Sequence, residues 1–200
     1  MLTIELIKEF HPITPEKILL LEEYNKLLLK FNENYNLIGK STISDFWQRH
    51  ILDCAQIIQF IDCKETIGDI GSGAGLPGII LAILGVKNVH LVEKSFRKCE
   101  FLAKMQKLLP NITIHQKRVE EIKNIRFDII TSRAFAPLEK ILTMSKPLLA
   151  KNGKYVLQKG KNTKIEIEKA KRKFSFDYDL KNSLTSDDGK IILIENVQYI

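Results

Sequence analysis

Apolar side chains recur at helical spacing near the start of the chain. After Thr14 they return every three or four positions, at Ile18, Leu19, Leu21, Tyr24, Leu27, Leu28 and Phe31. Thr14 can cap a helix, and Pro15 fits the first turn, where no backbone N–H is needed. The spacing predicts an amphipathic helix that begins here and buries one apolar stripe.

Polar and glycine residues at 32–34 and 39–40 interrupt this pattern before a second helical stretch. We expect a helix over residues 44–61, which is bounded by turn-forming residues. Its inner face should consist of Phe46, Trp47, Ile51, Leu52, Ala55 and Ile58. In this interpretation residues 1–62 form a helical cap on the rest of the chain.

From residue 66 short apolar runs alternate with helical segments, which is typical of parallel strands covered by crossover helices. Strands are expected near residues 66–70, 88–92, 112–115, 127–131, 154–158, 174–181 and 191–197, and helices near 77–85, 95–109, 119–122, 137–149 and 161–173. Turn-forming residues separate the last two strands, which should form an antiparallel hairpin. The pattern predicts a doubly wound α/β fold with a seven-stranded, mostly parallel sheet over residues 63–200.

The composition is that of an ordinary globular protein. With 200 residues, 44% of them apolar and 28% charged, the chain should form a single domain over residues 1–200. No apolar run approaches the roughly 20 residues that cross a bilayer, and no secretory signal is recognisable. We therefore expect a cytoplasmic protein without a membrane segment. The spacing of Cys54, Cys63 and Cys99 indicates neither a metal site nor a disulfide framework.

A formal charge of +7 favours a polyanionic partner. Lysine and arginine that bind phosphates release counterions, which drives association with nucleic acids. However, lysine, isoleucine and asparagine are abundant along the whole chain, and such a bias can also reflect genome composition. Charge alone therefore favours RNA binding only modestly.

A glycine-rich bend follows the first predicted strand. Residues 69–78 read Asp-Ile-Gly-Ser-Gly-Ala-Gly-Leu-Pro-Gly and lead directly into a predicted helix. In open α/β sheets the ligand crevice lies at the carboxyl ends of the strands, and a glycine-rich first turn lets the backbone approach a cofactor closely. Glu93 ends the second strand, where a carboxylate can accept hydrogen bonds from both ribose hydroxyls. Together these features predict a cofactor that contains adenosine.

The form of the bend favours S-adenosylmethionine over NAD. The glycines follow a G-x-G-x-G pattern, whereas the G-x-G-x-x-G pattern cradles a pyrophosphate. Asp69 stands where it can face the charged methionine portion of a sulfonium cofactor. The alternative is that the glycines only make a tight turn and that Glu93 is a solvated charge. The joint occurrence of strand, glycines, helix and acid favours the cofactor site.

Residues 71–78 closely resemble the bacterial ribosomal RNA small-subunit methyltransferase G family, also called glucose-inhibited division protein B. Matching segments occur in the family's order along nearly the whole chain: Tyr35-Asn36-Leu37, Arg49-His50-Ile51-Leu52-Asp53, Arg118-Val119-Glu120-Glu121, Phe127-Asp128, Thr131-Ser132-Arg133-Ala134-Phe135-Ala136 and Lys159-Gly160. The resemblance implies a Rossmann-like class I methyltransferase. It also implies methyl transfer from S-adenosylmethionine to N7 of one guanine, position 527, in the 530 loop of 16S ribosomal RNA.

The resemblance further implies which residues bind the cofactor. Gly71 and Leu76 would lie in the loop, Glu93 at the ribose, and Val119 with Glu120 near the adenine. Other residues of the glycine bend and Arg133 are also expected to bind the cofactor. The full list of expected cofactor-binding residues is Asp69, Gly71, Gly73, Gly75, Leu76, Glu93, Val119, Glu120 and Arg133. The chain departs from the family where aspartate often replaces Glu93, and where Phe96-Arg97-Lys98 stands in place of a Lys-Arg pair.

The residue chemistry agrees with a guanine N7 target. Methylation of an exocyclic nitrogen usually goes with an Asn/Asp-Pro-Pro-aromatic turn, and the sequence has Ser132-Arg133-Ala134-Phe135 at that place. Methylation of a pyrimidine carbon needs a cysteine nucleophile, and none of the three cysteines lies at a predicted strand end. Guanine N7 carries an in-plane lone pair, so correct positioning suffices.

Basic residues complete the expected site. Arg133 and Arg118 should organise it, although Arg133 could equally be an ion-pair partner of Glu120 or Asp128. His50 and Asp53 are expected to be a local helix-surface pair or a packing pair, with no catalytic step. The RNA contacts should come from Lys94, Arg97, Lys98 and Lys159, against the alternative that helix lysines form a solvated face.

The expected partner is 16S ribosomal RNA or the small ribosomal subunit, which a monomer would recognise by shape. No metal is expected. Two other functions stay open on the sequence: methylation of a small molecule or protein, and RNA binding without catalysis.

Overall fold

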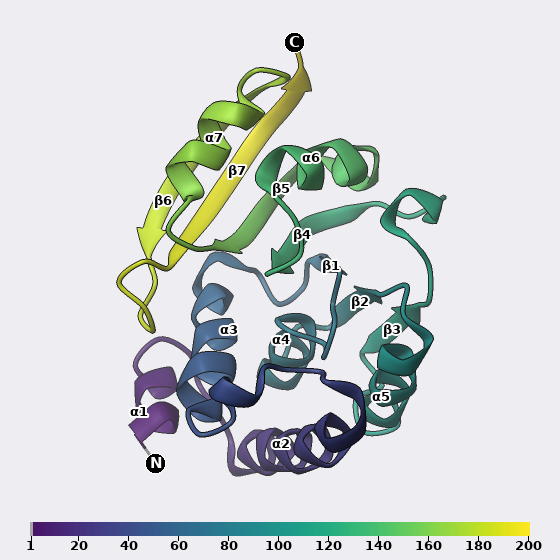
Figure 1. Ribbon diagram of the computed structural model, residues 1–200, viewed down its shortest axis with the longest axis vertical. Helices are drawn as coiled ribbons and strands as arrows, with labels where there is room; N and C mark the ends of the chain where they lie inside the picture. The colour runs from purple at the N-terminus through teal and green to yellow at the C-terminus, as the bar shows by residue number, and fades with distance from the viewer. Residues whose placement is uncertain (1) are drawn as a thin grey trace.

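The computed structural model describes residues 2–200 and is built around one seven-stranded sheet (Figure 1). The strand order is β3-β2-β1-β4-β5-β7-β6. In chain order the strands are β1 (Thr66–Ile70), β2 (Asn88–Val92), β3 (Ile112–His115), β4 (Phe127–Arg133), β5 (Leu149–Lys159), β6 (Phe174–Asn182) and β7 (Lys190–Tyr199). The prediction of a seven-stranded, mostly parallel sheet is confirmed.

The sheet changes winding direction between β1 and β4. β1 pairs in parallel with both β2 and β4, so the chain proceeds outward from β1 to one edge and then crosses back to β4. β7 runs antiparallel to both β5 and β6, which confirms the predicted hairpin. In open α/β sheets this switch point, at the carboxyl ends of the strands, is where ligands bind.

Helices cover both faces of the sheet. They are α1 (Leu2–Lys8), α2 (Pro15–Tyr35), α3 (Asp53–Ala55), α4 (Gly78–Leu84), α5 (Phe96–Gln106), α6 (Leu138–Ser145) and α7 (Thr163–Ala170). Short helices of other types are η1 (Lys40–Thr42), η2 (Trp47–Leu52), η3 (Gln56–Phe60), η4 (Val119–Glu121) and η5 (Lys146–Leu148). None of the helices within residues 2–200 is both long and apolar enough to cross a membrane.

Alternation along the strands divides the core into two layers. Ile129 and Val156 face one core, which also holds residues of α2, α4 and α5. The next residues, Ile130 and Leu157, face the other core, with α6 and α7. Successive strand side chains point to opposite faces, so β1, β2, β4, β5 and β7 each contribute to both layers. Figure 1 shows the two groups of helices on opposite sides of the sheet.

Three features of the helical cap differ from the sequence prediction. α1 was not predicted, although Ile4 and Ile7 are buried. Leu19 was placed in the buried stripe of α2 but is 64% exposed, because it lies just outside the face that packs. Residues 47–60 form one helical stretch that changes from π to α to 3-10 geometry. Each type continues for only a few residues here, so the spacing of apolar residues cannot distinguish them.

Candidate functional site

The glycine-rich bend joins β1 to α4 at the switch point. Gly71 and Gly75 have φ values of +71° and +81°, in the left-handed region that favours glycine. A Cβ at Gly71 would collide with the ring of Phe135, and one at Gly75 with Ile79. The Gly71 N–H also donates to the Val92 carbonyl at 2.9 Å. The bend is therefore packed tightly and held against the end of β2.

Glu93 follows β2 directly and is 7% exposed. One carboxylate oxygen accepts the Gly73 N–H at 3.0 Å, and the other accepts the Ser95 N–H at 2.8 Å. A carboxylate offers about four acceptor positions, so two bonds leave capacity for further donors. The bend thus orients an acid that can accept hydrogen bonds from a diol.

Asp69 is wholly buried in β1. Its Oδ2 accepts the N–H of Gly78, at the start of α4, at 3.0 Å, and its Oδ1 has no hydrogen-bond partner within residues 2–200. Burial raises the pKa of Asp69 to about 7, against the lowering effect of the Gly78 hydrogen bond. The carboxyl group connects β1 to α4 and carries an unused acceptor.

A cavity of about 430 Å³ opens beside the bend, at the carboxyl ends of β1, β2 and β4. We call it the first cavity. Seven residues predicted for the site line it: Gly71, Glu93, Lys94, Lys98, Arg118, Val119 and Glu120. Its volume lies within the range of small-molecule sites, roughly 300–1,000 Å³. The structure therefore brings the expected ribose, adenine and phosphate contacts to one place.

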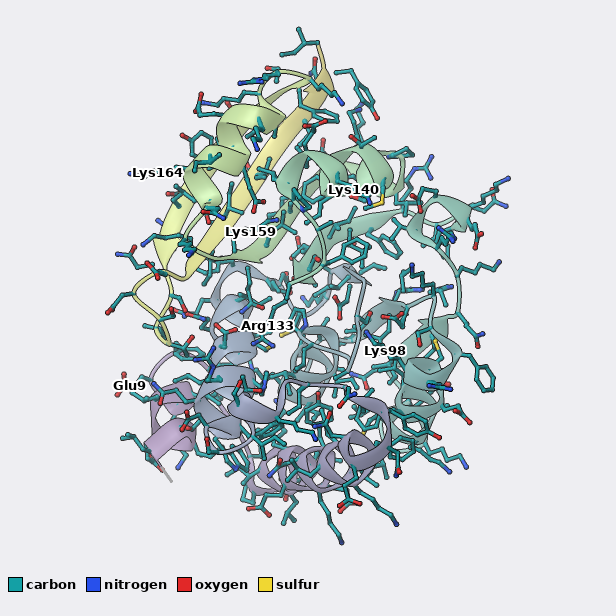
Figure 2. All side chains as sticks on the ribbon, viewed as in Figure 1. Glu9, Lys98, Arg133, Lys140, Lys159 and Lys164 are labelled. Carbon is teal, nitrogen blue, oxygen red and sulfur yellow. The ribbon has the colours of Figure 1, made fainter. Side chains whose placement is uncertain are left out.

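Basic side chains surround this first cavity. Lys94 and Lys98 come from the β2–α5 region, and Lys117 with Arg118 follows β3. Lys140 comes from α6; Figure 2 shows it and Lys98 on the two different helices. Lys117 and Lys140 were not predicted. The position of Lys117 just after a parallel strand was a usable signal, whereas nothing in the sequence indicated how α6 lies over the cavity.

A second cavity, of about 520 Å³, lies across the segment between β4 and α6. Ala134, Phe135 and Ala136 line both cavities. The wall of the second cavity includes two ionic groups, Arg133 with Asp53 and Lys159 with Glu166. It also contains two buried polar residues, Ser132 and Gln158. Ser132 Oγ and Gln158 Oε1 have no hydrogen-bond partner within the described residues.

Arg133 is held by three groups from the helical cap. Its Nε pairs with Asp53 Oδ2 at 2.8 Å, one terminal nitrogen donates to the Arg49 carbonyl at 2.8 Å, and the other lies 3.1 Å from His50 Nδ1. Because a guanidinium can only donate, His50 Nδ1 must accept and Nε2 must carry the proton. That Nε2 then donates to Thr42 Oγ1 at 2.8 Å. Burial and the positive charge of Arg133 lower the pKa of His50 to about 4, which keeps the ring neutral.

Arg133 thus forms an ion pair, but with neither of the predicted carboxylates. Its partner is Asp53, whereas Asp128 accepts the Thr66 N–H at 2.9 Å and Glu120 lines the first cavity. His50 and Asp53 both bind the Arg133 guanidinium and share no hydrogen bond with each other among the described residues. The arginine lines the second cavity and is not part of the first cavity's wall.

Lys159 lies in the wall of the second cavity and binds groups of the protein itself. Its side chain is 9% exposed, and Nζ binds Glu166 Oε2 at 2.8 Å and the Ala136 carbonyl at 2.7 Å. Figure 2 places it near the end of β5. Lys159 thus forms an internal ion pair, which ties β5 to α7 and to the β4–α6 segment. Its contact with the RNA stays a prediction.

The remaining predicted residues lie outside both cavities. Asp69, Gly73, Gly75 and Leu76 support the bend from behind or within it and line neither wall. Arg97 is exposed on α5, with its guanidinium carbon 6.0 Å from the ring centroid of Tyr35. Within residues 2–200, no cluster of three or more His, Cys, Asp or Glu side chains could hold a metal ion.

The chain is similar in sequence to a known protein family. The profile of the family described as rRNA small subunit methyltransferase G matches residues 17–193. The chain is 45% identical over 179 residues to ribosomal RNA small subunit methyltransferase G of Rickettsia rickettsii (strain Sheila Smith). That alignment covers 88% of this chain and 93% of the relative.

Solved structures with the same architecture are more distant in sequence. The ribosomal protein L11 methylase of Lactobacillus delbrueckii subsp. bulgaricus superposes with a TM-score of 0.60 at 17% identity, over 79% of this chain and 80% of that one. M. jannaschii TYW2, solved in complex with AdoMet, gives a TM-score of 0.57 at 14% identity, over 82% and 78% of the two chains. At these identities the likeness establishes the fold, that of a class I methyltransferase.

Proposed function

Because the chain belongs to the rRNA small subunit methyltransferase G family, we propose that it transfers a methyl group from S-adenosylmethionine to N7 of a guanine in 16S ribosomal RNA. The position that the sequence resemblance implies, in the 530 loop, is part of this proposal. The observation that carries it is the first cavity, where the glycine bend and Glu93 meet at the switch point of the sheet.

The residues present fit S-adenosylmethionine. Glu93 would accept from the ribose hydroxyls, because both of its oxygens keep free acceptor positions. Val119 and Glu120 would contact the adenine, and Gly71 admits the ligand close to the backbone. Asp69, Gly73, Gly75 and Leu76 would act indirectly, by fixing the shape of the bend. When bound, the cofactor supplies a methyl group on a positively charged sulfur.

The target guanine would enter the second cavity, which shares a wall with the first. Guanine N7 reacts through its in-plane lone pair, so no residue has to remove a proton. The protein's task is to orient the base, which converts binding into rate. Arg133 uses three of its five N–H groups within the protein and can donate another to the guanine carbonyl. Its pairing with Asp53 offsets its charge as the base becomes cationic.

The basic rim of the first cavity would hold the RNA backbone. Lys94 and Lys98 were expected there, and Arg118, Lys117 and Lys140 line the same cavity. Arg97 was also expected to contact the RNA and is exposed on α5, the helix of Lys98. Lysine and arginine contacts to phosphates position RNA without reading its sequence. We place the reaction on the small ribosomal subunit or its 16S RNA in the bacterial cytoplasm, with the protein acting as a monomer.

Methylation assays distinguish this proposal from the two alternatives. The protein would be incubated with labelled S-adenosylmethionine and either small ribosomal subunits or naked 16S RNA from cells that lack the modification. N7-methylguanine is then mapped by borohydride reduction and aniline cleavage. We expect one cleavage site, in the 530 loop.

Other outcomes contradict the proposal in different ways. Cofactor binding without any RNA methylation would indicate a small-molecule or protein methyltransferase. RNA binding without cofactor binding would indicate a protein that binds RNA and has no catalytic activity.

A further inference from the structure

Phe135 is an aromatic residue whose surroundings do not resemble ordinary core packing. It lies in the segment between β4 and α6 and keeps 39% of its surface exposed. Its ring lies against Gly71, where any side chain would collide with it. The ring is therefore held in a fixed position at the mouth of the glycine bend, while part of its surface stays accessible to a ligand.

The ring stands where the two cavities meet. Among the residues that the structure describes, only Ala134, Phe135 and Ala136 belong to both walls. The alanines end at Cβ, so Phe135 alone supplies an extended surface at the junction. With a cofactor in the first cavity and a base in the second, this ring would lie at the boundary between the two ligands.

The backbone next to the ring adopts a conformation that side chains rarely allow. Ala134 has φ +50°, in the left-handed region where non-glycine residues are uncommon. Such conformations persist where the surrounding structure imposes them, and they cluster at ligand sites. Here the unusual residue directly precedes Phe135 and follows Arg133, which three cap residues hold in place.

We propose that Phe135 is the surface on which the purine to be methylated stacks. Stacking on an aromatic ring fixes the plane of a base and tolerates any base, so it suits positioning while other groups select guanine. Methyl transfer also makes the purine cationic, and the face of an aromatic ring attracts a cation. Phe135 would therefore help both to bind the base and to stabilise the charge that develops on it. This inference rests on the proposed function.

The test compares substitutions that remove or keep the aromatic face. Phe135→Leu keeps an apolar side chain without a π face, and Phe135→Trp keeps the face. Phe176→Leu, on the edge strand β6, is the matched control. On unmodified small ribosomal subunits, Phe135→Leu should lower kcat/KM by about 10- to 100-fold, the range that stacking of one base supports. Phe135→Trp should retain more of this activity than Phe135→Leu, and Phe176→Leu should remain close to wild type. The Kd for S-adenosylhomocysteine should change much less than kcat/KM in Phe135→Leu and should be unchanged in Phe176→Leu.

A spectroscopic measurement is independent of turnover. Trp47 is the chain's single tryptophan, so Trp47→Phe/Phe135→Trp carries one indole at the junction of the cavities. With S-adenosylhomocysteine bound, addition of small subunits should quench its fluorescence, because a stacked base contacts the indole. The matched protein Trp47→Phe/Phe176→Trp should show no such change.

The outcomes separate this inference from the function on which it rests. If the wild-type protein fails to methylate guanine N7, the proposed function is wrong and the stacking role falls with it. If the wild type is active and Phe135→Leu equals it, the function stands and the stacking role is wrong. The stacking role is also wrong if Phe135→Leu loses cofactor affinity as much as activity, or if the indole at 135 does not respond to subunits.

Discussion

Asp69 and His50 are buried titratable side chains near the site, and burial favours the neutral form of both. It raises the pKa of Asp69 to about 7 and, with the charge of Arg133, lowers that of His50 to about 4. A neutral His50 is the form that can accept a hydrogen bond from Arg133. Burial therefore fixes the hydrogen-bond pattern around the arginine as well as the charge of the site.

Replacing Asp69 with asparagine should change how stability depends on pH. In the unfolded chain the carboxyl has a pKa of about 3.9, so between that value and about 7 the folded protein keeps a proton that the unfolded chain releases. The stabilisation that this retained proton gives to wild type is complete below the pKa of the unfolded chain. It is lost as the pH rises through the pKa of the folded protein. We therefore compare the free energy of unfolding of Asp69→Asn with that of wild type. The difference in favour of the variant should grow by about 1 to 4 kcal/mol as the pH rises from 4 to 8.

Urea unfolding of both proteins at several pH values measures this difference. His50 titrates in both proteins, so its contribution cancels. A stability difference that stays constant from pH 4 to pH 8 would show that Asp69 has an ordinary pKa in the folded state.

At the residue scale, the sequence predicts what depends on local order. The glycine bend and Glu93 stand where the pattern placed them, because both follow directly from the ends of β1 and β2. The partner of Arg133 was not predictable in this way. Asp53 precedes it by 80 positions in the chain, and their contact depends on how the helical cap packs against the end of β4.

The elements around the second cavity are joined by the ion pair of Lys159 with Glu166. Glu166, on α7, also accepts the Leu138 N–H at the start of α6 at 2.8 Å. Lys159 binds the Ala136 carbonyl as well. This one carboxylate and one ammonium therefore connect β5, α6, α7 and the segment that carries Phe135.

Breaking this pair should destabilise the fold. Lys159→Met leaves the partly buried Glu166 carboxylate without its cation and should cost about 1 to 3 kcal/mol in free energy of unfolding. Glu166→Gln should lower the free energy of unfolding less in the Lys159→Met protein than in wild type, because the two side chains interact directly. Urea unfolding of the two single variants and the double variant measures the coupling.

The pair of Lys173 with Glu139 serves as the control. Its side chains are 62% and 34% exposed, and exposed pairs contribute at most about 1 kcal/mol. Equal costs for Lys159→Met and Lys173→Met, or additive effects of the first pair, would contradict the internal role of Lys159.

At the element scale, strand positions were more predictable than helix geometry. β1, β2 and β3 begin and end where the apolar runs do. β5 begins five residues before the predicted start, at Leu149, because its first residue pairs with Phe127 ahead of an irregularity in the register. Such an extension depends on the neighbouring strand and leaves no pattern in its own residues. The same is true of the π-helix in the cap.

Across the whole molecule, positive charge gathers around the first cavity. Five basic residues line it, namely Lys94, Lys98, Lys117, Arg118 and Lys140, against the two carboxylates of Glu93 and Glu120. The basic residues outnumber the acidic ones in this wall, where an RNA backbone would approach. The sequence predicted part of this surface from α5, but the contribution of α6 became visible only in three dimensions.

Salt dependence tests this surface. Each phosphate contact adds about 0.7 to 0.9 to the slope of log K against log salt concentration. Arg97→Ala and Lys140→Ala should each weaken RNA binding and lower that slope by about one contact. Arg97→Ala should leave cofactor affinity unchanged, because Arg97 lies outside the first cavity. Lys26→Ala, on the exposed side of α2, should change neither quantity. An unchanged slope for Arg97→Ala or Lys140→Ala would remove that residue from the RNA surface.

The central claim is that the glycine bend and Glu93 form the site for S-adenosylmethionine. Isothermal titration calorimetry with S-adenosylhomocysteine tests it most directly, with Glu93→Gln compared against Glu100→Gln, an exposed control on α5. We predict one binding site in the wild type and in Glu100→Gln, and a Kd at least about tenfold higher in Glu93→Gln, since a charged hydrogen-bond acceptor is lost. Absence of binding to the wild type, or equal affinity in all three proteins, would contradict the account.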